Sequence, residues 1–227
     1  MVTVAAGSSA ASDFVAARQF MVDGQIRTNK VTDERLIEAL VAIPRENFVP
    51  ADIRARAYID DDLPVGNGRY LVEPMVLARL IQALNVQPGE KVLIVGAAGG
   101  YSAALLARLG ASVVALEDAQ GLAETARNGL AGLHVTLVSG ALANGHAQAG
   151  PYAAILVEGS VGEVPGSLLD QLKIGGRLAT VLREDNITAG RAVLMTRGDG
   201  GTVGTRILFD ANTPLLAGFE PTPRFAF

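Results

Sequence analysis

The stretch Lys91–Gly110, KVLIVGAAGGYSAALLARLG, decides the fold of this chain. Its apolar residues Val92–Val95 predict a buried strand and the glycines after them a tight turn. The run from Tyr101 to Leu109 predicts a helix that ends at Gly110. A glycine loop lets a ligand approach the backbone, and the free N–H groups of a helix start favour polar or anionic groups. The stretch therefore predicts a cofactor loop at the carboxyl end of a parallel strand.

The segments downstream continue the alternation of strand and helix. Strand-like runs follow at SVVAL, HVTLV, AAILV and RLATVL, with helix-like runs between them, one of them from about Gly121 to Leu130. Two closing strands, RAVLMTR and TVGTRILF, flank the turn GDGG. Near-continuous apolar strands that alternate with helices indicate a parallel sheet covered on both faces. We therefore expect an α/β fold with a doubly wound Rossmann-like sheet, N-terminal helices and a C-terminal antiparallel β-hairpin.

The front of the chain reads as helices. Ser12 is expected to cap a helix through DFVAARQFMV, and Thr32 a second helix through DERLIEALVAI. A short third helix is expected after Pro50, and DLPVGNGRYLVEP reads as a glycine-bearing loop before a helix opened by Pro74. The expected organisation is a flexible tail at 1–12, a helical cap and substrate-side loop at 13–73, and a Rossmann-like domain at 74–227.

The composition excludes several classes of function. The net charge of −4 leaves no basic field for nucleic acid. The chain has no cysteine and only two histidines, which excludes disulfides, zinc–thiolate sites and a His-rich metal site. No apolar run approaches the roughly 18 to 20 residues of a membrane span, and the N-terminus lacks the features of a signal peptide. We expect a cytoplasmic protein with no nucleic-acid or membrane partner; the apolar ends of LLAGFEPTPRFAF leave a homo-oligomer open.

Three kinds of cofactor loop compete for the glycine turn. A dinucleotide fingerprint needs glycine at 96, 98 and 101, and Ala98 and Tyr101 break it. A Walker loop needs a Gly-Lys-Ser/Thr ending, which the chain lacks. An S-adenosylmethionine loop fits Gly96 and Gly100, and Glu117 at the end of the second strand can accept both hydroxyls of a ribose. A further interpretation is that these glycines only make tight turns. The S-adenosylmethionine loop and the plain tight turn therefore stay open here.

Motifs outside the loop make a specific match. The chain resembles the protein-L-isoaspartate O-methyltransferases, repair enzymes that methylate isoaspartyl carboxylates, in MVDGQI, AIPRENFVP, AYIDDDLPVGNG, VQPGEKVLIVGAAGGYSAALLARLG and EVPGSLLDQLKIGGRL. The similarity runs from about Met21 to the C-terminal hairpin. It implies a class I methyltransferase sheet, S-adenosylmethionine as the cofactor, and an isoaspartyl protein or peptide as the acceptor.

The resemblance also implies site residues. Cofactor-binding positions are Gly96, Ala98, Gly100, Glu117, Ser139 and Gly140, and substrate-side positions are Asn67, Arg69, Tyr70 and Val72. Several of these depart from the family pattern. The family's serine beside the substrate carboxylate is Val72 here, so no catalytic residue is assigned, and its threonine is Tyr70. The family's acid in the first strand is Ile94, its middle glycine is Ala98, and its aspartate that faces the adenine is Ser139.

These departures weaken the expectation of isoaspartate activity. The aliphatic side chain of Val72 cannot donate a hydrogen bond, and Glu73 adds a negative charge near the expected carboxylate. Like charges about 4 Å apart at an effective dielectric of about 20 cost on the order of 4 kcal/mol. Glu158 stands where the family has a small residue, and we interpret it as a solvated loop acid rather than one that points into the cleft.

Two hypotheses of different classes follow. In the first, the chain is an S-adenosylmethionine-dependent O-methyltransferase that acts on isoaspartyl protein or on a changed acceptor bordered by Asn67, Arg69 and Tyr70. In the second, it is a catalytically silent member of the family that serves as a binding or interaction module. The affinity for the cofactor separates the two.

Overall fold

The computed structural model describes residues 7–118, 126, 129–183 and 189–220. Its α-helices are α1 Gly7–Met21, α2 Glu34–Ala42, α3 Pro74–Leu84, α4 Tyr101–Arg108 and α6 Gly166–Leu169. Its strands are β1 Leu63–Gly66, β2 Arg69–Leu71, β3 Lys91–Val95, β4 Ser112–Glu117, β5 Val135–Ser139, β6 Tyr152–Val161, β7 Leu172–Leu182, β8 Gly190–Arg197 and β9 Val203–Ala211. Short 3-10 turns at Arg45–Phe48 and Ala51–Arg56 join α2 to β1.

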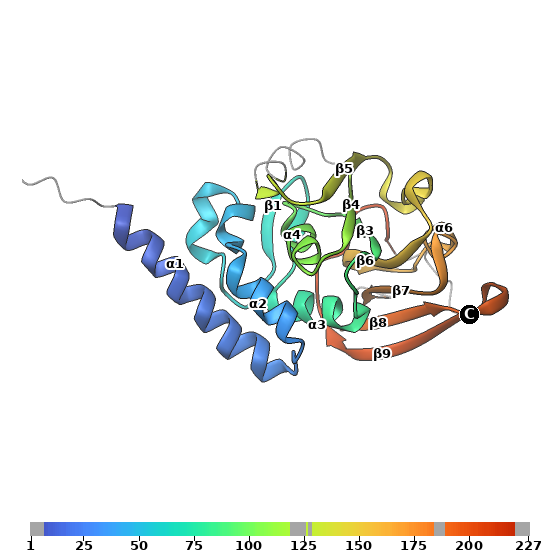
Figure 1. The fold of residues 1–227 in the computed structure, drawn as a ribbon, viewed down its shortest axis with the longest axis horizontal. Coiled ribbons are helices and arrows are strands. Elements are labelled where there is room, and N and C mark those ends of the chain that lie inside the picture. Colours follow the sequence, from blue (N-terminus) through green and yellow to red (C-terminus); the bar gives the residue numbers. More distant parts are fainter. Residues whose placement is uncertain (1–6, 119–125, 127–128, 184–188, 221–227) are drawn as a thin grey trace, which may run out of the picture.

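The described strands form one large sheet and one small one. The seven-stranded sheet has the order β5-β4-β3-β6-β7-β8-β9, and β1 pairs with β2 in a separate hairpin. The first five strands in this order, from β5 to β7, run parallel to one another. Strand β8 is antiparallel to both of its neighbours, β7 and β9. The strand order reverses between β3 and β6, which is the switch point where doubly wound sheets bind ligands. The expected Rossmann-like sheet with a C-terminal hairpin is confirmed, and Figure 1 shows the turn of that hairpin on the far side of the molecule from α1.

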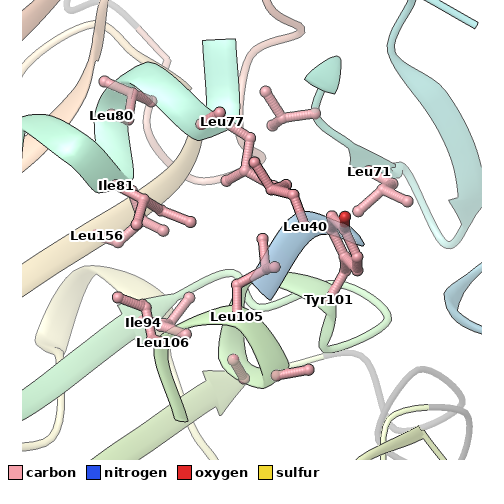
Figure 2. Packing of buried hydrophobic residues seen from close by; sticks show 14 of the residues in the cluster. Leu40, Leu71, Leu77, Leu80, Ile81, Ile94, Tyr101, Leu105, Leu106 and Leu156 are labelled. Carbon is pink, nitrogen blue, oxygen red and sulfur yellow. The ribbon is translucent and has the colours of Figure 1, made fainter. Parts of the chain in front are cut away.

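The two faces of the sheet follow from the alternation of side chains along β3. Val92 and Ile94 belong to a core shared with α2, α3 and α4, and Leu93 and Val95 belong to a second core under α6. Figure 2 shows Ile94 among side chains of the first core, from α3, α4 and β6. Ile94 is therefore a core residue that is fully excluded from solvent.

Several local predictions were wrong. Helix α1 begins at Gly7, so Ser12 lies inside it and does not cap it. Helix α2 is capped by Asp33, whose side chain accepts from the N–H of Arg35, rather than by Thr32. Asp33 is favoured over Thr32 as the cap because its Oδ1 also accepts from the Arg35 side chain, and because a carboxylate is stabilised at the start of a helix. The segment after Pro50 forms 3-10 turns in place of an α-helix.

The segment expected as a loop before α3 also differs. Leu63–Gly66 and Arg69–Leu71 pair as a hairpin, with Asn67 and Gly68 at positive φ in its turn. An Asn-Gly pair supplies this backbone conformation and was the available signal, whereas the flanking residues do not alternate between apolar and polar, since Arg69 is buried and Tyr70 exposed. The helix expected at about Gly121 to Leu130 lies mostly outside the described residues. Among the described helices, none has an apolar stretch long enough to cross a bilayer.

Candidate active site

The glycine loop sits between β3 and α4, as the sequence predicts. Gly96, Ala98 and Gly100 all have positive φ, at +74°, +45° and +91°. Glycine adopts this conformation freely, whereas Ala98 has a Cβ and is strained there. A side chain at Gly99 would collide with the backbone carbonyl of Phe48, so the PRENFVP segment packs directly on the loop.

Glu117 lies at the end of β4, directly beside the loop. Its Oε2 accepts from the backbone N–H of Ala98 at 3.0 Å, and only 3% of the residue is exposed. Its Oε1 accepts from the Nε–H of Arg69 at 3.1 Å. The Nη2 of Arg69 also pairs with Asp118. A cation from the β1–β2 hairpin thus holds the carboxylate that the sequence assigns to the cofactor.

The third strand end completes this edge of the sheet. Ser139 pairs in register with Glu117, and the N–H of Gly140 donates to the Glu117 carbonyl at 3.4 Å. Ser139 and Gly140 are both exposed. The structure therefore brings the predicted cofactor residues of β3, β4 and β5 to one edge of the sheet; their role in binding stays a prediction.

The substrate side is built from the hairpin and the strand that follows it. Arg69, Tyr70 and Val72 line one small cavity, with Glu158 opposite, while Asn67 lies in the hairpin turn. Val72 is buried and belongs to the hydrophobic core. Its carbonyl accepts from Nη2 of Arg45 at 2.8 Å.

Arg45 is a fully buried cation that the sequence analysis missed. Its Nε donates to the Ala57 carbonyl at 2.8 Å, and its guanidinium lies 5.1 Å from the centre of the Tyr101 ring. Burial lowers the pKa of Arg45 from its ordinary value, and the charges of Tyr101 and Glu158 oppose that shift. Its place in the AIPRENFVP motif was the available signal.

Glu158 is not a solvated loop acid, and that interpretation was wrong. It lies at 3% exposure, and its Oε2 accepts from the hydroxyl of Ser102 at 2.5 Å. Burial raises the pKa of Glu158 to about 7, helped by the charge of Glu117, while Ser102 and Arg45 act the other way. The last residues of β6 explain the burial, because Ser160 donates to the carbonyls of Thr213 and Pro214, and this segment covers the end of the strand.

A second acidic group borders the hairpin. Burial raises the pKa of Glu73 to about 7, and the charges of Asp62, Asp60 and Asp61 add to the shift. Burial also raises the pKa of Asp62 to about 6, although its Oδ1 accepts from the Glu73 N–H at 2.9 Å. The negative charge expected from Glu73 is therefore partly suppressed at neutral pH.

Leu216 closes the site from the C-terminal side. A Cβ built on Gly96 would lie 2.9 Å from Cδ1 of Leu216, and one on Gly159 would lie 3.2 Å from its Cβ. The remaining cavity between the hairpin and the end of β6 measures about 10 Å³. That is room for a single water at most. Entry of any larger ligand requires this segment or the hairpin to move.

Comparisons with known proteins agree on one family. The model of the "Protein-L-isoaspartate(D-aspartate) O-methyltransferase (PCMT)" family matches residues 16–206. A protein-L-isoaspartate O-methyltransferase of Methylorubrum populi is 45% identical over 168 residues, 72% of this chain and 78% of the relative. Protein-L-isoaspartate O-methyltransferase 1 of Rhodopseudomonas palustris is 37% identical over 226 residues, 96% and 92% of the two chains.

Solved structures share the fold. A structure of a protein-L-isoaspartate O-methyltransferase aligns with a TM-score of 0.77 at 24% identity, over 88% of this chain and 66% of the other. A Plasmodium falciparum protein described as a putative protein-L-isoaspartate O-methyltransferase, solved in complex with S-adenosyl-L-homocysteine, aligns with a TM-score of 0.73 at 19% identity, over 89% and 97%. The match of the family model over most of the chain, joined to the class I sheet and its glycine loop, places this chain in the protein-L-isoaspartate O-methyltransferase family.

Proposed function

We propose that this chain is an S-adenosylmethionine-dependent O-methyltransferase that methylates isoaspartyl carboxylates of proteins or peptides. The observation that carries the proposal is the position of Glu117, a buried carboxylate within hydrogen-bond distance of the glycine loop at the carboxyl edge of the sheet. A carboxylate there can accept the hydroxyls of a ribose. Membership of the family supports the same cofactor and acceptor.

The donor set fits the cofactor in chemistry. The backbone at Gly96 and Gly100 can approach a ligand closely, and Glu117, Ser139 and Gly140 lie along the same strand ends. When bound, S-adenosylmethionine supplies an already activated methyl group. Leu216 packs closely on Gly96, because a Cβ built on this glycine would lie 2.9 Å from Cδ1 of Leu216.

The chain's own residues then have two tasks. An acceptor carboxylate is a nucleophile at neutral pH, so no general base is required, and the protein has to align it and exclude water. Tyr70 and Leu216 border the closed cavity and can exclude water from it. The acceptor oxygen would bond to the methyl group as the methyl–sulfur bond breaks, and S-adenosylhomocysteine would leave, so the protein's task is to hold the acceptor carboxylate in line with that bond.

A second candidate function has a specific observation in its favour. Arg69 pairs with Glu117 and Leu216 packs against Gly96, so two of the expected cofactor positions already contact other parts of the chain. A catalytically silent member that serves as a binding module would keep such a packed site. A changed acceptor is the intermediate case, in which the cofactor binds but isoaspartyl peptides are not methylated.

Calorimetric titration separates these cases. The purified protein is titrated with S-adenosylmethionine and S-adenosylhomocysteine, and we expect micromolar binding. Methylation of an isoaspartyl peptide is then compared with that of the same peptide with normal aspartate, and we expect transfer to the first only. Binding without transfer to either peptide indicates a changed acceptor. No binding up to millimolar cofactor overturns the proposal in favour of the silent module.

A further inference from the structure

Arg69 and Glu158 line the small cavity between the hairpin and β6, and each carries a buried polar atom with no hydrogen-bond partner among the described residues. These are Nη1 of Arg69 and Oε1 of Glu158, whose residues are 4% and 3% exposed. Leaving a buried polar atom unpaired costs about 1 to 3 kcal/mol, and native proteins generally give such atoms a water or a ligand. The pair therefore marks a place that receives a polar group.

The guanidinium of Arg69 is fixed so that one nitrogen stays available. Its Nε donates to Glu117 and its Nη2 pairs with Asp118, so two acids hold one edge of the planar group. Nη1 lies on the other edge of the fork. The two acids compensate the charge of Arg69 and orient it, while Nη1 keeps its donors for a ligand.

Glu158 is oriented in the same manner. Ser102 donates to Oε2, so a proton on this carboxyl belongs on Oε1, the atom without a partner. Burial holds the pKa of Glu158 near 7, so that much of the residue is protonated at neutral pH. The charged groups that act on it are Arg45 in the 3-10 turn and Glu117 in β4, and Arg69 lines the same cavity. In its protonated form, Oε1–H is a donor.

We propose that Arg69 and Glu158 together form the seat of the acceptor carboxylate, with Nη1–H of Arg69 and Oε1–H of Glu158 as its two hydrogen-bond donors. The seat rests on the proposed function, since it names the group that holds the acceptor. It takes over the task of the hydroxyl that Val72 cannot perform. The carboxylate keeps its charge and a free lone pair for the methyl group, and Arg69 and Glu158 act by position without gaining or losing a covalent bond.

The charge around the seat favours an anion over a cation. Nη1 of Arg45, a second fully buried guanidinium, also has no partner among the described residues, and its charge acts on Glu158. With Glu158 neutral, the two atoms of the seat are both donors, which suits a carboxylate and gives an ammonium acceptor no lone pair to bind. Since the cavity of about 10 Å³ is too small for a carboxylate, Tyr70 at its rim, 37% exposed, or Leu216 has to move aside as the peptide enters.

Peptide binding without chemistry tests the seat. An isoaspartyl peptide is titrated calorimetrically into the protein, with and without S-adenosylhomocysteine, at pH values from 6 to 8.5. The variants are Arg69→Gln, Arg69→Lys and Glu158→Gln, and exposed Arg206→Gln on β9 is the matched control. Loss of a charge-assisted donor should weaken peptide binding by Arg69→Gln about tenfold or more, whereas Arg206→Gln leaves it unchanged.

The pH profile is the second readout. The donor form of Glu158 is present below its pKa and is lost as the pH rises through about 7, so wild-type peptide affinity should fall about tenfold by pH 8.5. The amide of Glu158→Gln donates at every pH, so this variant should show a flatter profile than wild type, and the slope that remains belongs to Glu73 and Asp62. Thermal unfolding checks each variant, and if Arg69→Gln does not fold, Arg69→Lys and Glu158→Gln decide.

The results of these titrations test the seat and the proposed function independently of each other. Wild-type affinity for the peptide in Arg69→Gln, or an unchanged pH profile in Glu158→Gln, overturns the seat even when S-adenosylhomocysteine binds. The seat is equally overturned if the wild-type protein binds no isoaspartyl peptide, or binds the normal aspartyl peptide equally well. If S-adenosylhomocysteine does not bind, the proposed function fails, and the titration without it still decides the seat.

Discussion

Nε of Arg69 lies 3.1 Å from Oε1 of Glu117, although the two residues are 48 positions apart in the chain. This buried ion pair joins the β1–β2 hairpin to the end of β4, and so ties the expected acceptor side to the expected cofactor side. Because both side chains are almost fully buried, neither charge can be left alone without a large penalty. The pair therefore couples the position of the hairpin to the state of the cofactor acid.

The substitution Glu117→Gln should weaken cofactor binding. The amide keeps the size of the side chain but loses the charge that strengthens hydrogen bonds to hydroxyl groups. We expect the Kd for S-adenosylhomocysteine to rise about tenfold or more, measured by calorimetry. The matched control is Asp210→Asn, an exposed acid on β9. Equal affinities for wild type and Glu117→Gln would show that this carboxylate does not contact the cofactor.

Removal of the Leu216 side chain should open the space above Gly96. Leu216 is 4% exposed within the second core, so Leu216→Ala should lower the free energy of unfolding by about 2 to 5 kcal/mol. The same variant should bind S-adenosylmethionine several-fold more tightly, because no side chain has to be displaced. Urea unfolding and calorimetry measure the two effects. A loss of stability with unchanged affinity would mean that Leu216 does not obstruct the cofactor.

Much of the fold was predictable because it rests on local pattern. The apolar run Val92–Val95 and the glycines after it identify a buried strand and a βα turn from their own residues. Gly96 and Glu117 were placed at one edge because parallel strands end on the same side of a sheet. The hairpin at Leu63–Leu71 was not predicted because its strands are short and residue type does not follow burial in them, with Arg69 buried and Tyr70 exposed.

The site was less predictable, since its key contacts join distant segments. No local sequence pattern predicts that Arg69 pairs with Glu117. The burial of Glu158 likewise depends on a segment more than fifty residues later in the chain. Exposure of a charged residue is a property of tertiary packing, which composition does not reveal. The domain boundaries, the cytoplasmic location, the oligomeric state and the absence of nucleic-acid partners stay predictions.

Restoring glycine at position 98 should be almost neutral for stability. Ala98 has a φ of +45°, where its Cβ costs roughly 1 kcal/mol, and glycine removes that strain while it adds chain entropy to the unfolded state. We expect Ala98→Gly to change the free energy of unfolding by about 0.5 kcal/mol or less. Ala107→Gly in helix α4 is the matched control and should cost about 1 kcal/mol. Equal losses in urea unfolding would indicate that Ala98 is not strained.

The stability of the fold should depend on pH through Glu158. Its pKa is raised to about 7 in the folded protein, above the ordinary value of 4.5, so the unfolded chain loses this proton first. The stabilising contribution is complete below about pH 4.5 and is lost as the pH rises through 7, by an amount on the order of a few kcal/mol. The pKa values of Glu73 and Asp62 shift in the same direction, so part of this pH dependence belongs to them.

The variant Glu158→Gln tests this contribution because its side chain cannot ionise. The difference in the free energy of unfolding between pH 5 and pH 8, measured with urea, should be smaller for the variant than for wild type. If the two differences are equal, the Glu158 carboxyl is ionised at its ordinary pKa, and its role as a donor at neutral pH is excluded.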